Sequence, residues 1–113
     1  MNDLAIRLEN VDQRHGRYVA HVAGLDGEAE LTFTWRGEHL LSADHTGTPE
    51  ELQGKGIALA LVERLVADAR AEGFKIIPLC PYIRDKYAAH PEWADVMTSR
   101  PGEMPHIVIG KPA

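Results

Sequence analysis

The sequence predicts a mixed α/β (α+β) domain, in which an antiparallel meander of strands leads into a β-α-β unit and a short C-terminal helix. Alternating apolar and polar residues occupy the first half of the chain, as expected for strands with one buried face. Helical spacing replaces this alternation after residue 56, and a short apolar run follows the helix. The 113 residues, of which 44% are hydrophobic and 26% charged, suffice for one domain with its own core.

Four strand candidates, separated by turns, occupy the first half of the chain. Glu28–Trp35 carries the clearest signal, because its apolar residues fall at every second position and would share one face. We expect Phe33 and Trp35 to pack in the core or at its edge and not to form a platform for a ligand. The other candidates alternate more weakly or are shorter: Leu4–Leu8, Tyr18–Ala23 and His39–Thr46.

A helix is predicted over Gly56–Glu72, because its apolar residues recur every three or four positions and would face a core. Charged residues largely cover the opposite side of this helix. Gly73 follows where a helix commonly ends on a residue in the left-handed conformation. The predicted apolar face consists of Ala58, Leu61, Val62, Leu65, Val66 and Ala69.

Shorter elements are expected after this helix. Ile76–Cys80 is an apolar strand in which Pro78 limits the hydrogen bonds that the strand can make. Tyr82–Ala89 can form two helical turns that end before Pro91, since the residue before a proline disfavours helix. Glu92–Met97 is expected to add a further turn.

The chain divides into one domain, residues 1–97, and a C-terminal loop or tail, residues 98–113. Prolines and glycines are frequent in the C-terminal part, which favours irregular structure. Ile107–Ile109 is the one segment of it that could pair as a strand. We find no internal repeat, low-complexity segment or linker that would indicate a second domain.

The strand His39–Thr46, the long helix and the strand Ile76–Cys80 together make the β-α-β unit. Its crossover should be right-handed, which makes the two strands parallel neighbours in one sheet. Ligands of such units collect at the carboxyl ends of the strands, beside the N-terminus of the helix. That corner of the predicted fold holds His45, the segment Gln53–Ala58 and Cys80, so we expect the chemistry of the protein there.

Charge and cysteine content narrow the classes of function. The net charge of −5, with histidines neutral, disfavours general binding of nucleic acid. Cys80 is the only cysteine and can form neither an internal disulfide nor a cysteine-based zinc site, and the histidines lack metal-ligand spacing. No apolar run reaches the roughly 18 to 20 residues of a membrane span, and Met1–Asn10 lacks the apolar stretch of a signal peptide. We therefore expect a cytoplasmic protein without metal or membrane binding.

The segment Gln53–Ala58, which we call the glycine turn, lies where a loop is expected to become a helix. Glycines let the backbone approach a ligand closely, and the unpaired N–H groups of a helix N-terminus favour a phosphate or pyrophosphate. Lys55 would add a positive charge. A loop that merely enters a helix is the alternative interpretation. The spacing excludes a Walker-type phosphate loop, and the third glycine of the dinucleotide fingerprint is missing.

The glycine turn and the segments that follow it resemble a known family. Gln53-x-x-Gly56-x-Ala58 fits the Arg/Gln-x-x-Gly-x-Gly/Ala signature of the GNAT superfamily of acetyl-CoA-dependent N-acetyltransferases. The resemblance to small, single-domain members is strong over His45–Asp95, and the preceding strands match by pattern only. It implies a minimal GNAT-like fold. The block that carries it comprises His45–Ala58, Leu61-Val62, Pro78–Tyr82, and Tyr87 with His90-Pro91-Glu92-Trp93.

The resemblance implies a site for acetyl-CoA as co-substrate. Backbone N–H groups of the glycine turn would hold the pyrophosphate of CoA. The pantetheine arm would then run between the strand that ends near Thr48 and the strand that ends at Cys80, and the thioester would arrive near His45 and Cys80. The residues implied in cofactor binding are Thr48, Gln53, Gly54, Lys55, Gly56, Ile57 and Ala58.

Three side chains are candidates for catalysis, each with an alternative structural role. Cys80 could accept the acetyl group or line the acyl pocket, and it could equally be a small buried residue. His45 could take a proton from the acceptor, or form a hydrogen bond at the end of a strand. Tyr87 resembles the tyrosine that protonates the departing CoA thiolate in many GNAT enzymes, and packing is its alternative role.

The expected function is the transfer of an acetyl group from acetyl-CoA to a primary amine that the sequence does not specify. Compared with full-length GNAT domains, the chain lacks the last two strands, and no acidic residue corresponds to the general base of larger relatives. Two alternatives follow: a CoA- or acyl-CoA-binding module with little catalysis, or a subunit whose partner completes the acceptor site. The sequence is compatible with a monomer and with self-association.

Overall fold

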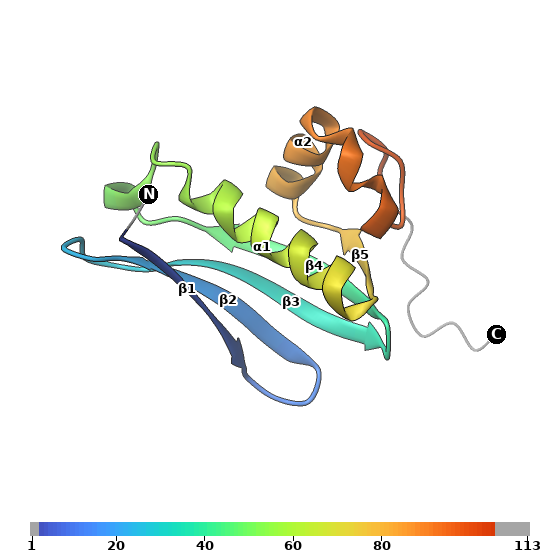
Figure 1. Ribbon diagram of the computed structural model, residues 1–113, viewed down its shortest axis with the longest axis horizontal. Helices are drawn as coiled ribbons and strands as arrows, with labels where there is room; N and C mark the ends of the chain where they lie inside the picture. Colours follow the sequence, from blue (N-terminus) through green and yellow to red (C-terminus); the bar gives the residue numbers. More distant parts are fainter. Residues whose placement is uncertain (1–2, 106–113) are drawn as a thin grey trace.

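A computed structural model describes residues 3–105, which form a five-stranded sheet with helices on one face (Figure 1). The strands lie across the sheet in the order in which they occur in the sequence. They are β1 (Leu4–Asn10), β2 (His15–Val22), β3 (Ala29–Gly37), β4 (Leu40–Gly47) and β5 (Lys75–Pro78). The helices within the described range are η1 (Glu50–Leu52), α1 (Ile57–Glu72), α2 (Pro81–Ala89) and η2 (Pro91–Val96), where η denotes a 3₁₀-helix.

The predicted mixed α/β class is confirmed. Each of the first three strands pairs antiparallel with the next, and β4 pairs parallel with β5 across the crossover made by α1. The alternation in β3 has the predicted effect, since Ala29, Leu31 and Phe33 are buried in the core shared with α1. β2 begins at His15, before the predicted start at Tyr18, and η1 was not predicted.

The end of β5 differs from the prediction, because this strand stops at Pro78 and not at Cys80. The last pair of the parallel ladder is Ala43 with Pro78. The backbone N–H groups of Leu79 and Cys80 then both donate to the carbonyl oxygen of Ala43, at 3.1 and 3.0 Å. Two donors on one acceptor turn the chain out of the sheet, and Cys80 becomes the residue that precedes α2.

The segment after η2 runs beside the outer edge of β5. Met97 forms a bridge with Ile76, and the Thr98 N–H donates to the Ile76 carbonyl at 3.0 Å. Residues 98–105 contain no helix or strand. The predicted strand Ile107–Ile109 lies outside the described residues.

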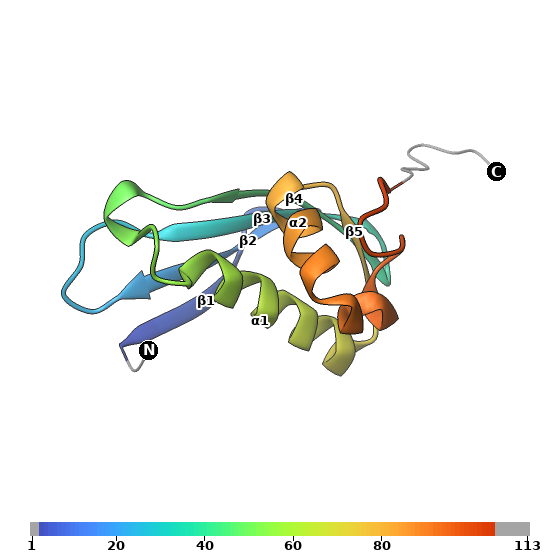
Figure 2. The ribbon, with the colours of Figure 1, turned by 90° about the horizontal axis from the view of Figure 1, so that it is seen from above.

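α1 lies across one face of the sheet and contacts β2 and β3 (Figures 1 and 2). The Tyr18 hydroxyl of β2 donates to Asp68 of α1 at 2.6 Å; burial and this carboxylate raise the pKa of Tyr18. Gly73, with φ of 81°, ends the helix as predicted, and its N–H donates to the Ala69 carbonyl at 2.9 Å. No helix in residues 3–105 is long and apolar enough to span a membrane. The buried residues of α1 are Ile57, Leu61, Val62, Leu65, Val66 and Ala69.

A row of aromatic rings extends the core from β2 to Phe74, two residues after the end of α1. Neighbouring ring centroids are 5.7 Å apart for Tyr18 and Phe33, 6.1 Å for Phe33 and Trp35, and 5.0 Å for Trp35 and Phe74. The last two pairs meet edge to face, a favourable arrangement for aromatic quadrupoles. Phe33 and Trp35 therefore have the packing role that the sequence indicates.

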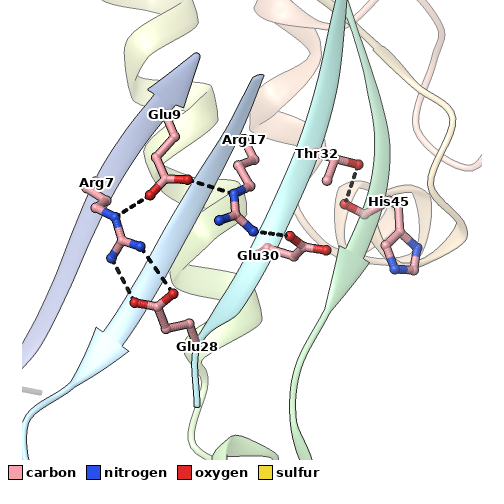
Figure 3. Close-up of polar contacts among 7 residues, drawn as sticks. All are labelled: Arg7, Glu9, Arg17, Glu28, Glu30, Thr32 and His45. Atoms are coloured by element: carbon pink, nitrogen blue, oxygen red, sulfur yellow. Dashed lines mark hydrogen bonds and ion pairs between the residues drawn. The ribbon is translucent and has the colours of Figure 1, made fainter. Parts of the chain in front are cut away.

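The face of the sheet opposite α1, which we call the open face, carries charged side chains from three neighbouring strands (Figure 3). Arg17 contacts Glu9 and Glu30, each at 2.8 Å. Arg7 contacts Glu9 at 2.6 Å and Glu28 at 2.9 Å. Ion pairs this exposed contribute little to the free energy of unfolding. Their charged side chains make the open face a surface in contact with water and not a second core.

The core beneath α1 makes one prediction. Leu61 is fully buried, so Leu61→Ala should lower the free energy of unfolding by about 3 kcal/mol through lost burial and the cavity left behind. Leu8 on β1 is 46% exposed and serves as the control, because Leu8→Ala should cost less than about 1 kcal/mol. Urea denaturation of both variants measures the difference. Equal losses would contradict the placement of the core between α1 and the sheet.

Candidate functional site

The glycine turn, Gln53–Ala58, takes the chain from η1 into α1. Gly54 and Gly56 both have φ of 76°, in the left-handed region that side chains disfavour. A Cβ atom at either position would meet no atom within 4 Å, so the backbone dihedral and not crowding requires glycine. The Gln53 Nε2 donates to the Thr48 carbonyl at 3.1 Å, which ties the turn to the residue that follows β4.

α1 begins without a side-chain cap. Its first backbone bond joins the Ala60 N–H to the Gly56 carbonyl at 3.1 Å, so the preceding N–H groups of the first turn lack a partner within the helix. The first turn also contains no acidic residue that would offset the helix dipole. The start of α1 is therefore an electropositive surface that favours an anion.

A pocket of about 430 Å³, which we call the α1 pocket, opens at this helix N-terminus. Six of the seven residues that the sequence associates with a cofactor line it; the exception is Lys55, which is exposed. In the part of the chain that the structure describes, no carboxylate is among the lining residues. These are Thr48, Leu52, Gln53, Gly54, Gly56, Ile57, Ala58, Leu59, Tyr82 and Lys86.

Four of the lining residues were missed by the sequence analysis: Leu52, Leu59, Tyr82 and Lys86. Tyr82 and Lys86 are four positions apart on α2 and therefore share one face of that helix. This spacing is the sequence signal from which their common position on α2 could have been predicted. α2 returns to the start of α1 because β5 is short. The sequence pattern misses this arrangement because it predicts that the strand continues to Cys80.

β4 and β5 diverge at their carboxyl ends, beside the α1 pocket. The ladder ends at Ala43 and Pro78, whereas β4 continues to Gly47. Within the described residues, no strand pairs with the β5 side of β4 beyond Ala43. Cys80 lies at this divergence, 4% exposed, with its Sγ 3.6 Å from the Thr46 Oγ1. The gap offers an extended ligand the free edge of a strand.

His45 lies on the open face of the sheet, away from Cys80. The register between β3 and β4 shifts here: Phe33 pairs with Ala43 and Thr32 with His45, which leaves Asp44 as the extra residue of a β-bulge. Without the bulge, alternation from Ala43 would turn His45 toward α1. The structure thus corrects the expectation that His45 and Cys80 lie together.

Because of the bulge, the Thr46 side chain lies toward Cys80. Strict alternation along β4 would have placed the His45 side chain there instead. Thr46 pairs with Leu31, whose side chain belongs to the core under α1. The His45 backbone carbonyl accepts a hydrogen bond of 3.5 Å from the Thr32 hydroxyl, and its imidazole is exposed (Figure 3). No group of three His, Cys, Asp or Glu side chains in residues 3–105 could hold a metal ion.

Tyr87 is fully buried on the inner side of α2. Its hydroxyl donates to the Ser99 carbonyl at 2.7 Å, which anchors the segment after η2. Burial raises the pKa of Tyr87, with smaller contributions from Glu103 and Asp95. Tyr87 does not line the α1 pocket, so the structure does not bring its hydroxyl together with the predicted cofactor residues.

Comparison with protein families agrees with this arrangement. A family model described as GCN5-related N-acetyl-transferase matches residues 17–96, which run from β2 through η2 and include the α1 pocket and the divergent strands. The fold and the match define an acyltransferase domain. The chain belongs to the GCN5-related N-acetyltransferase family. A comparison with curated protein sequences found no match.

A second prediction follows from the positive φ angles in the glycine turn. Gly54→Ala should lower the free energy of unfolding by about 1 to 2 kcal/mol, the cost of a left-handed alanine. Gly37→Ala is the control, since a Cβ there would meet only an ordinary contact at 3.9 Å and its φ is not in the left-handed region. Urea denaturation measures both variants. Equal effects would show that the turn does not require a left-handed residue at Gly54.

Proposed function

We propose that the chain is an acetyl-CoA-dependent N-acetyltransferase that acetylates a primary amine. One observation carries this proposal: the residue that directly follows the free edge of β4 also lines the α1 pocket. Thr48 lines the pocket and directly follows β4, whose last residues lie beside Cys80. An anion-binding surface is thereby joined to a gap that suits an extended chain, and CoA combines a pyrophosphate with such a chain.

The fit of CoA follows from the chemistry of these two parts. Its pyrophosphate would accept hydrogen bonds from the N–H groups at the glycine turn and the start of α1. The two amides of its pantetheine arm would pair with the free edge of β4, as an added strand does. The thioester would then lie near Thr46 and Cys80.

In the ternary mechanism, the neutral amine attacks the carbonyl carbon of the thioester and the carbon–sulfur bond breaks. The amine nitrogen loses one proton and the CoA thiolate gains one. Backbone N–H groups at the free edge of β4 would stabilise the oxyanion. CoA would occupy the face that carries α1, so the amine would arrive from the open face. His45 lies on that face and is the candidate for the proton acceptor.

Two tyrosines are candidates for the acid that protonates the thiolate. For Tyr87 to do so, its hydroxyl would have to leave the Ser99 carbonyl. Tyr82 lines the α1 pocket, and burial followed by the charge of Asp85 raises its pKa, so the hydroxyl carries a proton that it could donate. We therefore add Tyr82 to the sequence-based candidate.

The covalent alternative uses Cys80 as an acetyl carrier. Its thiolate would attack acetyl-CoA, release the CoA thiolate and form a thioester, which the amine would then cleave to regenerate Cys80. Its place beside the free edge of β4 supports this path. The burial of Cys80 opposes it, because only 4% of the residue is exposed and acetyl-CoA would have to reach its Sγ.

A second candidate function is a CoA-binding module with little catalysis, or a subunit that needs a partner for its acceptor site. β5 is the last strand in residues 3–105, and only the bridge from Met97 borders it on the outer side. The described part of the sheet therefore provides little wall around an acceptor. Acetylation by the chain alone would exclude both possibilities.

Two measurements on the purified chain test the proposal. We expect calorimetric titration to detect binding of CoA, and we expect acetyl-CoA to be consumed with at least one amine from a panel of polyamines, lysine peptides and small amines. Binding without turnover on the whole panel would favour the binding module or the incomplete subunit. No binding of CoA would contradict all three functions.

The charge at the start of α1 gives a matched pair of variants. Gly56→Asp and Gly56→Asn have nearly the same shape, and Asn and Asp both tolerate the φ of 76° at this position. Only the aspartate would repel the pyrophosphate, so we expect it to bind CoA at least tenfold more weakly than the asparagine variant. Calorimetry compares them. Equal affinities would show that the pyrophosphate does not lie at this helix terminus.

Cys80 separates the two mechanisms. In the ternary mechanism, Cys80→Ala should retain most turnover, and rapid-quench mass spectrometry of the wild-type chain with acetyl-CoA alone should detect no acetyl group on Cys80. In the covalent mechanism, the acetyl adduct should form before amine is added, and Cys80→Ala should be inactive. Circular dichroism of Cys80→Ala is the control for folding, because Cys80 is buried.

A further inference from the structure

Among residues 3–105, Lys86 is the only cation that lines the α1 pocket. Lys55, which the sequence places in the glycine turn, is exposed and outside the lining. Arg84, on the same helix as Lys86, donates to the carbonyl oxygens of Pro78 and Leu79, at 3.1 and 2.6 Å. Lys86 is therefore the positively charged side chain that an anionic ligand in this pocket would meet.

The position of the Lys86 side chain is set by Tyr82. The Lys86 Nζ lies 5.4 Å from the centroid of the Tyr82 ring, one helical turn earlier on α2. A cation over an aromatic face at this distance is attracted by the ring quadrupole. Both side chains are half-buried and both line the pocket. Tyr82 thus holds the ammonium at the pocket wall and limits its freedom in solvent.

The charge of Lys86 has no counterion within residues 3–105, since no carboxylate there lies within 4 Å of its Nζ. Asp85 is adjacent in the sequence but does not line the pocket. Gly54 and Gly56 line the same pocket, and no side chain approaches the positions of their missing Cβ atoms. The pocket thus combines free space at the glycine turn with an unpaired ammonium on α2.

We propose that Lys86, positioned by Tyr82, binds a phosphate group of CoA and determines selectivity for the phosphorylated cofactor over pantetheine. This inference rests on the proposed function, because it assumes that CoA occupies the α1 pocket. Lys86 contributes a charge-assisted hydrogen bond from α2 that is independent of the backbone donors of α1. The phosphate is either part of the pyrophosphate or the 3′-phosphate of the ribose.

Lys86→Met tests the proposal by calorimetry with three probes. We expect a loss of about tenfold in affinity for CoA, the effect of one partly exposed charge-assisted hydrogen bond, and no change for pantetheine, which has no phosphate group. A loss that extends to dephospho-CoA assigns Lys86 to the pyrophosphate. A loss confined to CoA assigns it to the 3′-phosphate.

Three further variants separate a specific contact from a change in net charge or in folding. Arg100→Met also removes one positive charge, but Arg100 is exposed and outside the pocket, so its affinity for CoA should equal that of the wild type. Lys86→Arg should restore affinity to within about threefold. Tyr82→Phe keeps the ring under Lys86 and should bind better than Tyr82→Leu by about threefold.

The outcomes distinguish this inference from the proposed function. If the wild-type chain does not bind CoA, the proposed function fails. If the wild type binds CoA and Lys86→Met binds it equally well, or loses pantetheine and CoA affinity in the same ratio, the role of Lys86 is overturned and the proposed function stands. Thermal unfolding of each variant verifies that α2 remains folded.

Discussion

The hydrogen bonds accepted by the Ala43 carbonyl oxygen determine how both parts of the site are arranged. Because this oxygen accepts the N–H groups of Leu79 and Cys80, β5 ends after four residues and the chain turns directly into α2. The edge of β4 beyond Ala43 stays free for a ligand, and α2 carries Lys86 back to the start of α1. If β5 had continued beside β4, the added residues would have filled that edge. The free edge and the α2 wall of the pocket thus have one common cause.

Much of the fold and the glycine turn could be predicted because their signals are local. The alternation in β3 and the helical spacing of α1 are each contained in one segment, and each has a single face to bury. Gly54 and Gly56 likewise need left-handed dihedrals that only a few residue types adopt readily. Chemistry that is confined to a few consecutive residues can be recognised in a sequence. The family match then agrees with the class of protein that these segments indicate.

The remaining features of the site depend on contacts between distant segments. A one-residue bulge at Asp44 reverses the faces of His45 and Thr46, and strict alternation gives no sign of it. The bond from Tyr87 to the Ser99 carbonyl requires the segment after η2 to return beside α2. Lys86 becomes a pocket residue because β5 is short. Each of these facts concerns register or chain length, and a small error in either moves a side chain to another surface.

The parallel pairing of β4 with β5 also has a consequence for the order of folding. The other strand pairs join neighbours in the sequence, so their contacts close short loops. The pairing of Leu41 with Ile76 must close a loop that contains all of α1, which costs more chain entropy. Because non-local contacts of this kind form late, the meander should assemble first and the divergent edge last. A nascent or partly denatured chain would then have most of its sheet before the free edge of β4 and the α1 pocket had formed.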